Sequence, residues 1–126
     1  MVLLLVSVVL AMIVCHEAAH VLITVACGGR FEGVVLQHVL AVGVRIRVDD
    51  LSARQIALTL IAGPVAEALV LGVAWQIHPM AWPLWLLLLG TQWMLNLIPW
   101  PWFPNDGSKL WRLMRQGRSA LTTVGR

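Results

Sequence analysis

The hydrophobic pattern divides the chain into three long apolar stretches, residues 2–27, 56–77 and 81–98, which more polar segments separate. A helix of about 20 mostly apolar residues crosses the hydrocarbon core of a bilayer, within a range of about 17–25. Helices are required there because the bilayer offers backbone groups no water to bond. The pattern therefore predicts three transmembrane helices, the third short but sufficient. Few ionisable side chains other than cysteines lie within them: His16, Glu17, His20 and Glu67.

Residues 28–50 have a different pattern. The segment VRIRV, residues 44–48, alternates strictly between apolar and basic side chains, which is typical of a half-exposed strand. The segment FEGVVLQ, residues 31–37, precedes it and is also rich in valine. We therefore expect a two-stranded hairpin near the cytoplasmic surface, with His38 solvated in or near its turn.

The C-terminal segment DGSKLWRLMRQGR, residues 106–118, places apolar side chains on one helical face and basic side chains around the rest. It predicts a basic amphipathic helix on the anionic cytoplasmic leaflet, with partner binding as the alternative. The predicted fold is therefore a mainly α membrane protein. It has three transmembrane helices, a small β-hairpin between the first and second, and a C-terminal amphipathic helix. A length of 126 residues fits one domain, residues 1–126.

The composition supports the membrane interpretation. Hydrophobic residues make up 60% of the chain and charged residues 12%, whereas soluble domains average about 45–50% and about 25%. A soluble fold of this size could not bury so much apolar surface. We therefore expect the lipid bilayer to be a partner of this chain.

The positions of the basic residues predict an orientation. All nine Lys and Arg lie either between the first two apolar stretches or after the third, and the loop HPMAWP has none. By the positive-inside rule the first connection and the C-terminus are cytoplasmic, and the N-terminus is outside. The net charge of +3 is thus explained by topology. No nucleic-acid partner is expected, because most tryptophans lie in or beside the third stretch and not on a basic face.

The motif HEAAH lies within the first apolar stretch. His16 and His20 are four positions apart, so both imidazoles can point at one metal ion from one face of a helix. Glu17, beside His16, can reach a water molecule at that ion without binding the ion. Zinc hydrolases obtain two of three protein ligands and a general base from this arrangement. Because three ionisable residues in a membrane helix are costly unless something binds them, the sequence predicts a Zn²⁺ site.

A third zinc ligand is needed, and the sequence offers few acidic residues. Glu67 lies in the second apolar stretch, and Asp106 lies in NLIPWPWFPNDGSKL after the third. The prolines of that segment exclude a continuous helix, and non-helical backbone at membrane depth is tolerated only where it lines a protein cavity. We therefore expect the segment, which begins at Asn96, to fold back towards the first helix. Asp106 and Glu67 are both candidates on these grounds.

The combination of HEAAH, AGPVAE and NLIPWPWFPNDG resembles the site-2 protease family of intramembrane zinc metalloproteases. The resemblance covers essentially the whole chain. It implies a general base at Glu17 and, at Asn96, a residue that assists substrate or oxyanion binding. It also implies that residues 31–48 can pair with an unwound substrate. The zinc ligands that it implies are His16, His20 and Asp106.

The chain departs from the family pattern in three ways. Asn96 and Asp106 are ten positions apart, where many members have eight. Glu67 stands where the second-helix motif often has asparagine. The chain also shows no PDZ-like domain, so substrate selection is expected to be minimal or supplied by an adaptor or regulatory membrane partner.

These observations predict an intramembrane zinc endopeptidase that cleaves a transmembrane segment of a substrate protein near the cytoplasmic face. The alternative is a catalytically silent membrane protein that keeps its zinc site for a structural or regulatory role. Glu17 argues against this alternative, because a structural site needs no base. A proton or metal transporter is a weaker option, since three helices without an inverted repeat offer no alternating-access machinery. The oligomeric state is not predicted.

The predicted orientation can be tested with reporter fusions near Pro79 and at Arg126. Because the basic residues fall on one side of the predicted spans, the Pro79 fusion should report the outer compartment and the Arg126 fusion the cytoplasm. Reporters in the same compartment would exclude the three-span arrangement.

Overall fold

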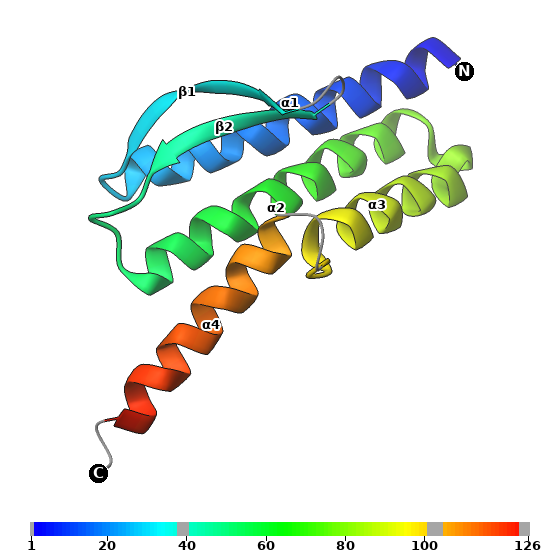
Figure 1. Ribbon diagram of the computed structural model, residues 1–126. Helices are drawn as coiled ribbons and strands as arrows, with labels where there is room; N and C mark the ends of the chain where they lie inside the picture. The colour runs from blue at the N-terminus through cyan, green and yellow to red at the C-terminus, as the bar shows by residue number, and fades with distance from the viewer. Residues whose placement is uncertain (1, 38–40, 101–104, 124–126) are drawn as a thin grey trace.

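The computed structural model describes residues 2–37, 41–100 and 105–123. The fold is mainly helical, with a two-stranded antiparallel sheet, as predicted. Figure 1 shows α2 between α1 and α3, the hairpin along α1, and α4 projecting from the bundle. The elements in chain order are α1 (Val2–Ala26), β1 (Arg30–Gln37), β2 (Ala41–Arg47), α2 (Ala53–Ile77), a 3₁₀ turn η1 (Pro79–Ala81), α3 (Trp82–Leu97) and α4 (Asp106–Thr123).

The ends of α1 and α2 follow from local sequence signals. Gly28 has a φ of 95°, which favours glycine, and its N–H donates to the carbonyl of Val25 after the last turn of α1. Ser52 caps α2: its side chain accepts from the N–H of Gln55, and the Gln55 side chain accepts from the N–H of Ser52. These contacts fix where the hairpin leaves α1 and where α2 begins.

The hairpin pairs β1 with β2 in antiparallel register, with Val34 opposite Val44. An irregularity between Phe31 and Gly33 shifts this register near the start of β1. Strand β2 ends at Arg47, one residue before the end of the alternating pattern. His38 lies outside the described residues, so its predicted place is not tested.

Two helices are long and apolar enough to cross a membrane. Both α1 and α2 have 25 residues, with mean hydropathies of 2.4 and 2.1. Helix α3 has 16 residues, which at 1.5 Å per residue extend about 24 Å, less than the roughly 30 Å of a hydrocarbon core. The predicted third span is therefore not confirmed, because only two of the described helices meet the length of a span.

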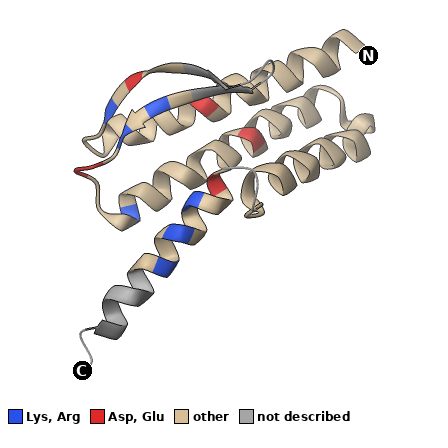
Figure 2. Ribbon diagram, in the orientation of Figure 1, with Lys and Arg blue, Asp and Glu red and all other residues tan. Residues whose placement is uncertain are grey.

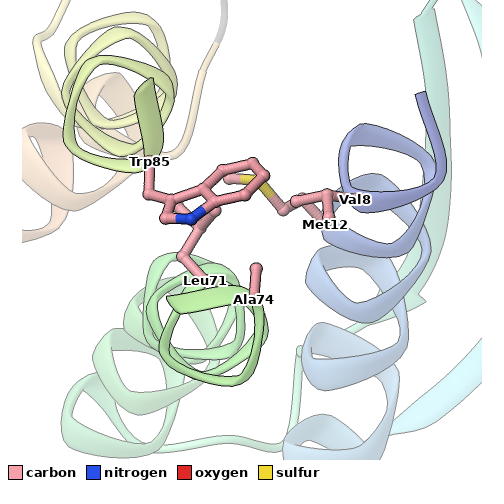
Figure 3. Packing of buried hydrophobic residues seen from close by; sticks show 5 residues of the cluster. All are labelled: Val8, Met12, Leu71, Ala74 and Trp85. Atoms are coloured by element: carbon pink, nitrogen blue, oxygen red, sulfur yellow. The ribbon is translucent and has the colours of Figure 1, made fainter. Parts of the chain in front are cut away.

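A small apolar core joins α1, α2 and α3 at the end of the bundle that carries the N-terminus. Figure 3 shows Trp85 of α3 reaching across Leu71 and Ala74 of α2 towards Met12 and Val8 of α1. The Trp85 ring is almost fully buried, and its indole N–H donates to the carbonyl of the residue before η1 at 3.1 Å. This core holds α3 against the bundle.

Outside this core, many large apolar residues face outward and several polar residues lie inside. The buried positions of α1 include His16, His20 and Thr24, and large aliphatic side chains on the outside are two-thirds or more exposed: Leu3, Leu22, Leu69 and Leu87. Such a surface suits lipid and not water. Figure 2 shows the basic residues on the hairpin, at the start of α2 and along α4, away from the N-terminal end of α1. The orientation in a membrane stays a prediction.

Candidate metal centre

Helices α1 and α4 bring three metal-binding side chains together inside the bundle. His16 and His20 lie one turn apart on α1, and Asp106 is the first residue of α4. Their donor atoms form a triangle: the two Nε2 atoms are 3.0 Å apart, and Asp106 Oδ2 lies 3.2 Å from His16 Nε2 and 3.0 Å from His20 Nε2. All three residues are buried. The structure thus gathers the three ligands implied by the resemblance at one point.

The partners of the other ring nitrogens determine which atoms can bind a metal ion. His20 Nδ1 lies 2.6 Å from the carbonyl oxygen of Thr59. Since a carbonyl only accepts, Nδ1 carries the hydrogen and the neutral ring has its lone pair on Nε2. His16 Nδ1 lies 2.9 Å from Glu67 Oε1, which favours the same tautomer. Both lone pairs therefore face Asp106.

This donor set fits a zinc ion. The Lys109 ammonium lies 3.1 Å from Asp106 Oδ1 and favours the ionised carboxylate. Two neutral imidazoles and a carboxylate then present three lone pairs to one another and need a cation among them. Ligands of a tetrahedral zinc at about 2.0–2.1 Å lie about 3.3 Å apart, close to the observed 3.0–3.2 Å.

Asp106 is held in place by its chain neighbours. The Asn105 amide donates to the carbonyls of Leu95 and Ile98 at the end of α3, and its oxygen accepts from the N–H of Ser108 in the first turn of α4. A Cβ on residue 107 would overlap the backbone of residue 97, so only glycine allows this approach. The NDG sequence therefore fixes the start of α4 against the end of α3. Within this connection, residues 101–104 lie outside the described residues.

Sequence reasoning missed Asn105 and Lys109. An asparagine immediately before a predicted helix is an N-cap signal, and this signal could have identified Asn105. Lys109 Nζ lies 3.1 Å from Asp106 Oδ1, on the oxygen that does not face the histidines. Its position three residues after Asp106 in a helix made such a pair foreseeable. Together they hold the backbone and the side chain of Asp106.

The AGPVAE segment of α2 approaches the histidines closely. A Cβ on Gly63 would lie 2.6 Å from His16 Cε1 and 2.7 Å from His20 Nε2. The carbonyl of Pro64 accepts a hydrogen bond from the Trp93 indole of α3 at 3.3 Å. Glycine at this point lets α2 pass directly beside the metal-binding atoms. Helices α1 and α2 are therefore in close contact at Gly63.

Glu67 and Asn96 lie behind the site. Glu67 contacts His16 on Nδ1, the ring nitrogen that points away from Asp106, and Asn96 Nδ2 donates to Glu67 Oε1 at 3.1 Å. Of the two candidates for the third ligand, the geometry therefore favours Asp106. Asn96 contacts a buried carboxylate, so its catalytic role stays a prediction.

Glu17 is turned towards the hairpin. Its Oε2 accepts a hydrogen bond from the N–H of Val44 at 3.0 Å. One edge of β2 pairs with β1. The Val44 N–H lies on the other edge, which faces α1. Among the described residues, Glu17 is not part of the group of metal-binding atoms, which agrees with a role beside the metal ion.

The fold and the site define a mainly helical protein that has two helices long and apolar enough to cross a membrane and a candidate His/His/Asp metal centre. The sequence matches the Peptidase M50B-like family over residues 2–106, from the start of α1 to Asp106. The chain therefore belongs to the Peptidase M50B-like family, a site-2 protease family, as its motifs predicted. Members of this family are in general zinc metalloproteases. Comparisons with curated proteins and with solved structures give no match.

The closeness of Gly63 to the site predicts that a single methyl group disrupts it. Gly63→Ala should sharply reduce zinc content, because the methyl must displace the His16 or His20 ring. Gly72→Ala, on the same helix, meets nothing within 4 Å and serves as the matched control. Zinc per chain in the purified variants is the measurement, and equal zinc content in both would contradict the observed packing.

Proposed function

We propose that this chain is an intramembrane zinc endopeptidase that cleaves a transmembrane segment of a membrane-protein substrate near the cytoplasmic face. The observation that carries the proposal is the buried triangle of His16, His20 and Asp106 in a member of a metalloprotease family with two apolar helices. A buried carboxylate with two imidazoles is a costly arrangement in a membrane protein unless it binds an ion. Three protein ligands leave the fourth zinc position open for catalysis.

The residues of the chain then take distinct roles. His16, His20 and Asp106 would hold the zinc ion, which acts as a Lewis acid on water and on the peptide carbonyl. Glu17, next to His16 and outside the ligand set, would accept the proton from the attacking water and pass it to the leaving nitrogen. Water would enter from the cytoplasmic side, where the basic hairpin and α4 are predicted to lie.

Strand β2 offers a place for the substrate. A peptide bond inside a helix is shielded, so the substrate must unwind before cleavage, and an extended peptide can add to a free strand edge. The N–H of Val44 is on such an edge, beside the proposed base. A substrate strand paired there would take over this N–H and release the Glu17 carboxylate for proton transfer. Substrate binding and activation of the base would thus be one event.

A catalytically silent zinc protein is the second candidate. The hydrogen bond between Glu17 and Val44 favours it, since the carboxylate is engaged by the hairpin. A glutamate without a catalytic role is nevertheless an unexpected choice within a membrane helix. The protease therefore remains our proposal. An adaptor or regulatory membrane protein is a proposed partner for substrate selection, and no nucleic-acid partner is proposed.

The proposed roles predict different losses in different variants. Glu17→Gln should keep zinc and lose cleavage by a factor of about 10² or more, because it removes the base and leaves the ligands intact. His16→Ala and Asp106→Asn should lose zinc and cleavage together. The measurements are zinc per chain and cleavage of a model transmembrane substrate in proteoliposomes. Cleavage by Glu17→Gln at nearly the wild-type rate would rule out the proposed mechanism.

The strand-edge role predicts a backbone effect at Val44. Val44→Pro removes the N–H that the substrate would use, so cleavage should fall at least tenfold while zinc content stays unchanged. Val44→Thr keeps the N–H and a branched side chain, and it should cleave at close to the wild-type rate. Loss of zinc in Val44→Pro would instead show that the hairpin supports the metal centre.

A further inference from the structure

The Glu67 carboxylate is buried, and polar groups from two other helices contact one of its two oxygens. It is 1% exposed and lies on the face of α2 that meets α1 and α3. Its Oε1 is 2.9 Å from His16 Nδ1 and accepts a hydrogen bond from Asn96 Nδ2 at 3.1 Å. Its Oε2 is buried and, among the described residues, has no hydrogen-bond partner. One oxygen therefore receives both groups, from two different helices.

We propose that Glu67, held by Asn96, is a positioning residue that orients His16 for the metal ion. The contact chain runs from the α3 amide through the α2 carboxylate to the α1 imidazole, and it reaches the metal site only through His16. This inference rests on the proposed metal site and not on proteolysis. It also assigns Asn96 to the support of a ligand, which differs from a role in binding substrate.

The physical reason is the two-sided chemistry of imidazole. A hydrogen-bond acceptor at Nδ1 fixes the tautomer that leaves the Nε2 lone pair free, sets the ring orientation and makes the ring a more basic ligand. His20 has such an acceptor in the Thr59 carbonyl. Beside His16 Nδ1 the acceptor is the Glu67 carboxylate, 2.9 Å away, although this contact lacks hydrogen-bond geometry in the structure. A metal centre with both rings fixed in this way keeps its three donor atoms at the spacing described above.

Geometry argues against the simpler roles for Glu67. A third ligand would have to face Nε2 of His16, and Glu67 faces Nδ1. A purely structural contact between α2 and α3 does not need a carboxylate, since the Trp93 indole already bonds α3 to the Pro64 carbonyl one turn earlier. A buried carboxylate with one unsatisfied oxygen costs stability. Its proposed use at His16 accounts for that cost.

The test is the zinc affinity of the purified protein in detergent or nanodiscs, measured by competition with a chelator. Glu67→Ala should weaken zinc binding about 10–100-fold, the loss expected when the partner of a metal-binding histidine is removed. Glu67→Gln keeps an oxygen acceptor and should stay within about fivefold of wild type. Trp93→Phe is the matched control: it removes the neighbouring α2–α3 hydrogen bond and should leave zinc affinity unchanged.

Asn96 gives a second, independent arm. Asn96→Ala should weaken zinc binding in the wild-type background and add nothing in Glu67→Ala, because its effect passes through Glu67. If Glu67→Ala does not fold, Asn96→Ala and Glu67→Gln still decide the question. Unchanged zinc affinity in Asn96→Ala with lower cleavage would assign Asn96 to the substrate and overturn the inference. So would equal losses in Glu67→Ala and Trp93→Phe.

The affinity measurements separate this inference from the proposed function. If wild-type protein binds zinc with the predicted variant pattern and cleaves no membrane substrate, the proteolytic proposal fails and the positioning role stands. If the protein cleaves substrate while Glu67→Ala binds zinc as tightly as wild type, the positioning role fails and the proteolytic proposal stands.

Discussion

The structure depends on three buried side chains that point their donor lone pairs at one position inside the bundle. His16, His20 and Asp106 present their donor atoms to one another at 3.0–3.2 Å, and nothing in an apolar bundle makes that arrangement favourable without a cation. A carboxylate with two imidazoles satisfies a divalent ion by charge and by geometry. The surrounding helices pack so that these three side chains can meet. This packing requires small residues and polar contacts at positions where a membrane protein would otherwise have aliphatic side chains.

Two close approaches make the convergence feasible. Gly63 lets α2 pass beside the histidines, and Gly107 lets the start of α4 lie against the backbone at the end of α3. The Asn105 amide donates to the carbonyls of Leu95 and Ile98 at the end of α3. Since α3 is itself anchored through Trp85 to α1 and α2, Asp106 is tied to α1 through packed helices and not only through the connecting segment. The Asp106 carboxylate is thereby fixed although it lies far from the histidines in sequence.

Local features of the sequence predicted most of the fold and part of the site. The spacing of His16 and His20 and the alternation in β2 depend on near neighbours, so their geometry follows from helix and strand periodicity. The residues alone left Asp106 and Glu67 as candidates for the third ligand, and the family resemblance favoured Asp106, because its position depends on how α4 packs. The contacts of Glu67 with His16 and of Glu17 with Val44 join different elements, and no local pattern could have revealed them. The predicted third span is not confirmed, because α3 has 16 residues and ends at Leu97, before Pro99.

The central claim is that one zinc ion is bound by His16, His20 and Asp106. X-ray absorption spectroscopy at the zinc edge, on protein reconstituted in a bilayer, tests the ligand set directly. The account predicts one zinc ion per chain with two imidazole nitrogens and oxygen ligands at about 2.0–2.2 Å. A sulfur ligand at about 2.3 Å, from Cys15 or Cys27, or a site with a single imidazole, would contradict it.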